Sequence, residues 1–135
     1  MTTLLFTPTV QTGNLLFVSG HIAKRDGQPW KGRLGETMTT AEGQEAARAV
    51  GEDLVATLEK AVGDLDKVSR IVKLMVLVHS GPDYTEQHLV ANGASQFFID
   101  RFGERGAHAR SAFGVAQLPF GVCVEIEMVV ELVHR

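Results

Sequence analysis

Hydrophobic and polar residues alternate near the C-terminal end of the chain, from position 122 to position 133. One side of the pattern consists of Val122, Val124, Ile126, Met128, Val130 and Leu132, and the other of Cys123, Glu125, Glu127, Val129, Glu131 and Val133. A period of two places alternate side chains on opposite faces of an extended chain. We therefore predict a β-strand over Val122–Val133 with one buried face.

The residues before this strand indicate a hairpin. Leu118-Pro119-Phe120-Gly121 is the expected connection, because proline fixes φ and glycine tolerates positive φ. Ser111–Gln117 would be the first strand, antiparallel to the second. Arg110 would then lie at the mouth of the hairpin, close in space to the stretch Glu125–Glu131.

The N-terminal pattern predicts two more strands. Met1–Phe6 is expected to be an edge strand. Asn14–Gly20 is rich in residues that favour strands, and His21–Lys24 is expected to continue it after a kink. Arg25-Asp26-Gly27 has the composition of a turn.

Two helices and a long strand are predicted in the middle of the chain. Thr39 and Glu42 have the spacing of a capping box, and Gly63 marks the expected end of this first helix. Its apolar stripe is Ala47, Val50, Leu54, Leu58 and Ala61. Val68–His79 is apolar on both sides, with Ile71, Met75 and Leu77 assigned to one side. A second helix is predicted over Tyr84–Phe102.

These elements, in the order ββαβαββ, predict a single α+β domain over residues 1–135. Each strand–helix–strand unit is expected to place two parallel strands side by side in one sheet, with both helices on the same face. Two helices cover one face only, whereas Val68–His79 is apolar on both. Because monomers rarely expose a large apolar patch, we expect a second copy of the chain to cover the other face.

Composition narrows the class of protein. The 135 residues are 44% hydrophobic and 21% charged, typical of a globular domain, and the net charge of −3 argues against binding to nucleic acid. There is no apolar run near 18 residues and no signal-peptide pattern, so we expect a cytoplasmic protein that binds no membrane. The single cysteine, Cys123, is interpreted as a small buried hydrophobic residue.

Common catalytic motifs are missing from the sequence. The five histidines show no HExxH-like spacing, and there is no phosphate-binding glycine loop or G-x-S-x-G elbow, so no metal or cofactor is expected. The remaining candidates are Arg110, whose planar fork matches a carboxylate, and Glu125, which can hold or deprotonate a water. Two other interpretations stay open: a surface ion pair, or a solvated face carrying Glu125, Glu127 and Glu131.

Three segments carry a family resemblance. His-Ala-Arg-Ser at 108–111, Val-Ala-Gln-Leu-Pro at 115–119 and Val-Glu-Ile-Glu at 124–127 resemble the C-terminal signature of the RidA family, also called YjgF/YER057c/UK114. The segment 14–22, Asn-Leu-Leu-Phe-Val-Ser-Gly-His-Ile, extends the likeness over nearly the whole chain. The resemblance implies a chorismate-mutase-like fold and a homotrimer with clefts between subunits.

The resemblance also implies a reaction. Proteins with this pattern are cofactor-independent imine/enamine deaminases, which hydrolyse small carboxylates such as 2-aminoacrylate to a keto acid and ammonia. By this likeness Arg110 would bind the substrate carboxylate and Glu125 would position the attacking water. Ser19 and Gly20 would line the cleft, and Asn92 matches a further cleft position.

This sequence departs from the family pattern at three cleft positions. Phe6 replaces a tyrosine, Ala112 a cysteine, and His108 the proline before Ala-Arg. These changes indicate a divergent branch with a reshaped pocket. Besides a deaminase, the residues are compatible with a non-catalytic metabolite-binding trimer, with a ribonuclease, or with a hydrolase of a larger ring-derived substrate.

Overall fold

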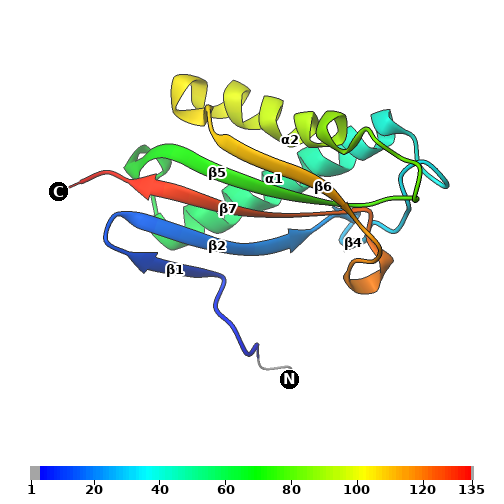
Figure 1. Ribbon diagram of the computed structural model, residues 1–135. Helices are drawn as coiled ribbons and strands as arrows, with labels where there is room; N and C mark the ends of the chain where they lie inside the picture. The colour runs from blue at the N-terminus through cyan, green and yellow to red at the C-terminus, as the bar shows by residue number, and fades with distance from the viewer. Residues whose placement is uncertain (1–3, 135) are drawn as a thin grey trace.

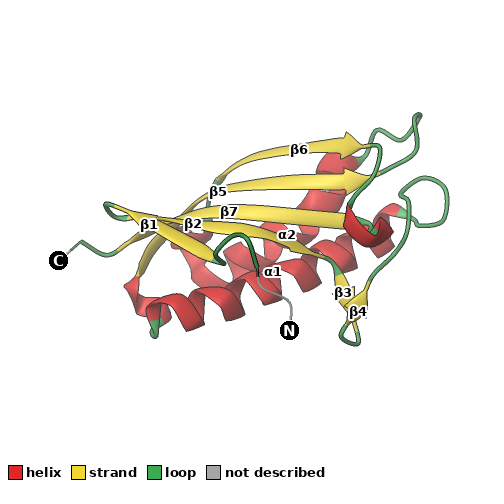
Figure 2. Cartoon of the chain, turned by 90° about the horizontal axis from the view of Figure 1, so that it is seen from below, coloured by secondary structure: helices red, strands yellow, loops and turns green. Residues whose placement is uncertain are grey.

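The computed structural model describes residues 4–134 and shows two helices on one face of a five-stranded sheet. The elements in chain order are β1 (Thr9–Thr12), β2 (Leu15–Ile22), β3 (Lys24–Arg25), β4 (Gln28–Pro29), α1 (Thr40–Val62), β5 (Val68–His79), α2 (Gln87–Phe102), β6 (Ala109–Val115) and β7 (Val124–Leu132). Figure 2 shows both helices on the same side of the strands. The predicted α+β class and element order are confirmed, and the short β3–β4 hairpin is an addition.

The strand order in the sheet is β1-β2-β7-β5-β6 (Figure 1). β7 lies antiparallel between β2 and β5, whereas β6 pairs in parallel with β5. The predicted hairpin of Ser111–Gln117 with Val122–Val133 is therefore wrong, because β5 separates the two strands. The crossover through α2 brings β6 beside β5, as predicted for strand–helix–strand units. The same prediction is wrong for the unit through α1, because β7 lies between the parallel strands β2 and β5. The segment around Pro119–Gly121 then carries the chain past β5 to the centre of the sheet.

The N-terminal edge also differs from the prediction. Residues 1–3 of the expected strand Met1–Phe6 lie outside the described part of the chain, and residues 4–6 form no strand. The edge strand is β1 instead, which pairs with β2 in the register Thr9↔Val18 to Thr12↔Leu15. Gly13, with φ of 56°, permits the tight turn between these strands.

The core lies between the sheet and the two helices, on what we call the helix-covered face. α1 begins at the predicted capping box, in which Thr39 and Glu42 bond to each other's backbone N–H. The fully buried residues of the sheet and α1 include Leu54, Leu58, Leu74, Val76, Ile126 and Val130. Ile71 is buried with Leu74 rather than sharing a side with Met75, because the β5–β7 register shifts between Ile71 and Lys73. Such a shift exchanges the two faces of the strand, so the strict alternation of faces assumed from the sequence does not hold across it.

α2 packs closely against α1 but begins later than predicted. A side chain at Gly93 would collide with the backbone of Gln44 on α1, so this glycine permits the helices to touch. The helix starts at Gln87 rather than at Tyr84. The carbonyl of Tyr84 is bonded instead by the side-chain amide of Gln87, at 2.8 Å, within a turn.

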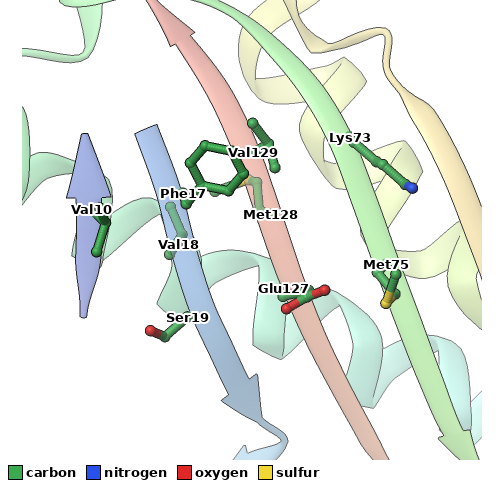
Figure 3. Close-up of a pocket in the computed structure, with 9 residues that line it drawn as sticks. All are labelled: Val10, Phe17, Val18, Ser19, Lys73, Met75, Glu127, Met128 and Val129. Atoms are coloured by element: carbon green, nitrogen blue, oxygen red, sulfur yellow. The ribbon is translucent and has the colours of Figure 1, made fainter. Parts of the chain in front are cut away.

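The opposite side of the sheet, which we call the open face, carries no helix. It holds a groove of about 430 Å³ lined by Val10, Phe17, Val18, Ser19, Lys73, Met75, Glu127, Met128 and Val129. Figure 3 shows Lys73 and Met75 on β5, with Glu127 of the neighbouring β7 opposite Met75. Phe17 is 45% exposed although it is aromatic. This face is the apolar surface that the sequence predicted on the second side of β5.

Candidate functional site

Arg110 lies on edge strand β6 and points to the helix-covered face. Its register partner on β5, Leu74, is fully buried on that face. Nη1 of Arg110 donates to Asn92 Oδ1 at 2.8 Å and to Ser95 Oγ at 3.1 Å. Nη2 donates to the backbone carbonyl of His88 at 3.3 Å. The first turns of α2 thus hold a half-buried guanidinium beside the sheet edge.

These three bonds determine what Arg110 can still bind. A guanidinium has five N–H groups, and both on Nη1 and one on Nη2 are used. The remaining two belong to Nε and Nη2, the nitrogens that together form one edge of the fork. Neither of these two N–H groups bonds to another residue within 4–134. One carboxylate accepts two such bonds in a bidentate arrangement.

A second polar chain continues from Ser95 to His108. Nδ1 of His108 lies 2.6 Å from the carbonyl oxygen of Gly106, and Nε2 lies 2.8 Å from Ser95 Oγ. A carbonyl only accepts, so Nδ1 carries the proton and Nε2 of the neutral ring accepts from the Ser95 hydroxyl. Burial, aided by the charge of Arg110, lowers the pKa of His108, while its bond to Gly106 raises it. The ring is therefore neutral at neutral pH.

Ala112 follows Arg110 on the same side of β6. Its register partner is the fully buried Val76, and Ala112 is partly buried against the core. Of the predicted cleft residues, Arg110, Asn92 and Ala112 thus lie together between β6 and α2. We call this set the arginine half.

Glu125 lies on the open face of β7. Its neighbours along the strand, Val124 and Ile126, are fully buried on the other face. A side chain at Gly20 would collide with Glu125 Oε2, so this glycine gives the carboxylate its space. Burial raises the pKa of Glu125, the nearby charge of Glu127 raises it further, and His21 lowers it. A raised pKa is useful in a group that exchanges protons near neutral pH.

Ser19 joins the N-terminal segment to β2. Its Oγ donates to the carbonyl of Thr7 at 2.7 Å, and its N–H donates to the carbonyl of Pro8 at 3.0 Å. The carbonyl of Ser19 accepts from His21 Nδ1 at 2.8 Å. Phe6 directly precedes the anchored Thr7 and is 60% exposed. Ser19, Gly20, Glu125 and Phe6 form what we call the glutamate half.

The two halves do not meet within one chain. Arg110 points to the helix-covered face from the edge of the sheet, whereas Glu125 stands on the open face near its centre. The predicted proximity of Arg110 to Glu125–Glu131 through a hairpin is wrong, because β5 lies between β6 and β7. Each half is nevertheless held in place within one chain: α2 bonds to Arg110, and Gly20 makes room for Glu125.

Sequence reasoning missed two residues of the arginine half. Ser95 and the carbonyl of His88 both bind the guanidinium. Ser95 lies three residues after Asn92, so both side chains project from one side of a helix. This spacing of three residues from Asn92 is visible in the sequence. The backbone carbonyl of His88, in contrast, has no sequence signal, because every residue has one.

Residues 4–134 contain neither a metal-binding cluster nor a helix that could span a membrane. No cluster of three or more histidine, cysteine, aspartate or glutamate side chains in this range has the geometry to bind a metal ion. Within the same range, neither helix is long and apolar enough to cross a membrane.

The chain is similar to several known proteins. Residues 2–132 match the family model described as Endoribonuclease L-PSP. Protein TCP17 of Trypanosoma cruzi is 52% identical over 125 residues, which are 91% of this chain and 78% of that protein.

Solved structures show the same likeness. The protein Atu1372 of Agrobacterium tumefaciens, described as having unknown function, superposes with a TM-score of 0.93 at 40% identity, over 96% of this chain and 82% of that one. RidA from an Antarctic Psychrobacter superposes with a TM-score of 0.64 at 26% identity, over 98% and 92% of the two chains. Because the family model spans almost every residue, the chain belongs to the Endoribonuclease L-PSP family, the RidA/YjgF family that its motifs resemble.

Proposed function

We propose that this protein is a hydrolytic deaminase of small enamine and imine carboxylates that yields a keto acid and ammonia. Membership of the family supports a small-molecule deaminase or a related role. The observation that carries the finer proposal is the free edge of Arg110, which offers two N–H groups to one carboxylate. Asn92 and Ser95 orient that edge through their bonds to Nη1.

In this proposal Glu125 activates the water. The carboxylate takes a proton from water as the oxygen attacks the imine carbon. Glu125 passes that proton to the imine nitrogen, which gives a neutral carbinolamine. It then takes the carbinolamine hydroxyl proton and delivers it to the amine as the C–N bond breaks, so ammonia and the keto acid leave and the carboxylate is regenerated. An imine carbon is already electrophilic, so orientation and proton transfer are sufficient and no cofactor is invoked. The raised pKa of Glu125 supports this role.

The complete site would lie between copies of the chain. The arginine half and the glutamate half occupy different faces, and the open face holds an apolar groove that one chain leaves uncovered. We propose a homotrimer in which the arginine half of each protomer faces the glutamate half of its neighbour. In such a ring every interface is alike, so three equivalent sites form.

The activity test uses 2-aminoacrylate generated in situ, with release of ammonia and pyruvate as the readout. Arg110→Ala removes two charged hydrogen bonds to the substrate and should lower kcat/KM by about a hundredfold or more. Arg101→Ala is the matched control, because Arg101 is exposed in the last turn of α2, beyond the turns that hold Arg110. Equal turnover by wild type and Arg110→Ala would refute the deaminase proposal.

The shared site has its own test. Arg110→Ala and Glu125→Gln chains should each be inactive alone. After the two are unfolded together and refolded as a 1:1 mixture, about a quarter of the sites combine an intact arginine half with an intact glutamate half in a cyclic trimer. Recovery of about a quarter of wild-type activity is expected, and no recovery despite mixed trimers would exclude a site shared in this way.

A non-catalytic binding protein is the second candidate. Phe6 supports it, since this residue lacks the hydroxyl that the family pattern places there. A thermal shift with pyruvate but no turnover of 2-aminoacrylate would favour binding alone. A ribonuclease is disfavoured by the net charge of −3, and failure to cleave RNA at low salt would exclude it.

A further inference from the structure

His108 is connected to Arg110 through a single hydroxyl. The imidazole Nε2 lies 2.8 Å from Ser95 Oγ, and the same oxygen lies 3.1 Å from Arg110 Nη1. The ring is fixed on its other side by the carbonyl of Gly106 and packs edge-on against Phe98, with centroids 6.4 Å apart. The imidazole is thus held from the 3-10 turn before β6 and from α2.

The direction of each bond in this chain follows from its ends. The carbonyl of Gly106 can only accept, so the neutral imidazole accepts at Nε2 and the Ser95 proton points toward it. The lone pairs of Ser95 are then directed at Arg110, which can only donate. Without an acceptor at position 108 the hydroxyl is free to rotate, and its proton competes for the space facing the guanidinium.

We propose that His108 is a positioning residue for Arg110, acting through Ser95 to keep both Nη1 protons engaged so that the Nε–Nη2 edge faces the ligand carboxylate. This inference rests on the proposed role of Arg110 in binding a carboxylate. At position 108 the family pattern has a proline, and the proline side chain has no hydrogen-bond acceptor. A proline at this position leaves Ser95 to be oriented by other means.

Protonation of His108 reverses the arrangement. Nε2 would become a donor to Ser95, and a second positive charge would stand across the hydroxyl from Arg110. Within residues 4–134, the groups that bond to the ring or pack against it are Ser95 and Phe98 from α2 and the Gly106 carbonyl, and the one charge that acts on it is that of Arg110 from β6. Acidification should therefore weaken the bond between Arg110 Nη1 and Ser95, and this effect should require His108.

The test compares three variants by two readouts. His108→Phe keeps an aromatic ring against Phe98 but removes both nitrogens, Ser95→Ala removes the hydroxyl, and His108→Gln restores an acceptor near Nε2. The first readout is the Arg110 Nε–H resonance in ¹⁵N NMR spectra of the ligand-free protein, assigned by its loss in Arg110→Ala. The second is the Kd for pyruvate.

We expect His108→Phe and Ser95→Ala to broaden or shift the Nε–H resonance and to weaken pyruvate binding about threefold to tenfold, the effect of one lost hydrogen bond. His108→Gln should restore both and should abolish the change seen in wild type on acidification. Wild-type values in His108→Phe, with only the melting temperature lowered, would show a purely structural role and overturn the inference. If wild type binds no pyruvate, the proposed function fails, while the ligand-free resonance still decides the role of His108.

Discussion

Gly20→Ala is the sharpest perturbation of the glutamate half. The added methyl group would occupy the position of Glu125 Oε2, so the carboxylate must move. Gly20 has no positive φ, so alanine introduces no backbone strain, and the atom it displaces is the end of a flexible side chain. We therefore expect a change in stability of about 0.5 kcal/mol or less, as at most surface positions.

The effect on catalysis should be much larger than the effect on stability. Restoring van der Waals distance requires a displacement of the carboxylate by about 1 Å, and a misplacement of this size typically costs about a hundredfold in rate. The assay is kcat/KM for 2-aminoacrylate, with urea unfolding of the same samples. Gly81→Ala is the matched control, because the three atoms nearest to its methyl group would all belong to the flexible side chain of Glu36, the closest at 3.3 Å.

A double mutant tests the route of the effect. If Gly20→Ala acts by moving Glu125, then Gly20→Ala combined with Glu125→Gln should be no slower than Glu125→Gln alone. Two results would refute the reasoning: a Gly20→Ala enzyme within twofold of wild type, or rate losses that multiply in the double mutant.

Three further predictions follow from burial and charge. Leu74→Ala should lower the free energy of unfolding by about 2–5 kcal/mol in urea titrations, because Leu74 is fully buried, and a loss below about 1 kcal/mol would contradict its place in the core. Burial raises the pKa of Cys123 to about 11, so a disulfide reagent at pH 8 should label the native protein far more slowly than the urea-unfolded chain. The pKa of Glu125 lies above its ordinary 4.5, so deaminase activity should fall as pH decreases through that raised value; an acid limb at or below 4.5 would exclude Glu125 as the base.

The sequence by itself determined the two helices, the long strand β5 and the buried side of β7, but not the N-terminal edge strand or the side on which Ile71 lies. The alternation along β7 predicted which residues are buried, because a strand with one face in the core must place apolar side chains at every second position. The capping box at Thr39 and Glu42 predicted the start of α1, since local backbone hydrogen bonds decide helix ends. The motifs were sufficient to identify the family.

Only the tertiary structure decided how the strands are ordered and what surrounds each candidate residue. Neighbouring strands in sequence suggested a hairpin, but β7 lies between β2 and β5 and pairs with the 12-residue β5 instead of the 7-residue β6. Long-range pairing depends on the whole sheet, which local pattern does not encode. For the same reason Arg110 and Glu125, fifteen positions apart, lie on opposite faces, and the bonds from Ser95 and His88 to the guanidinium appear only once α2 packs beside β6.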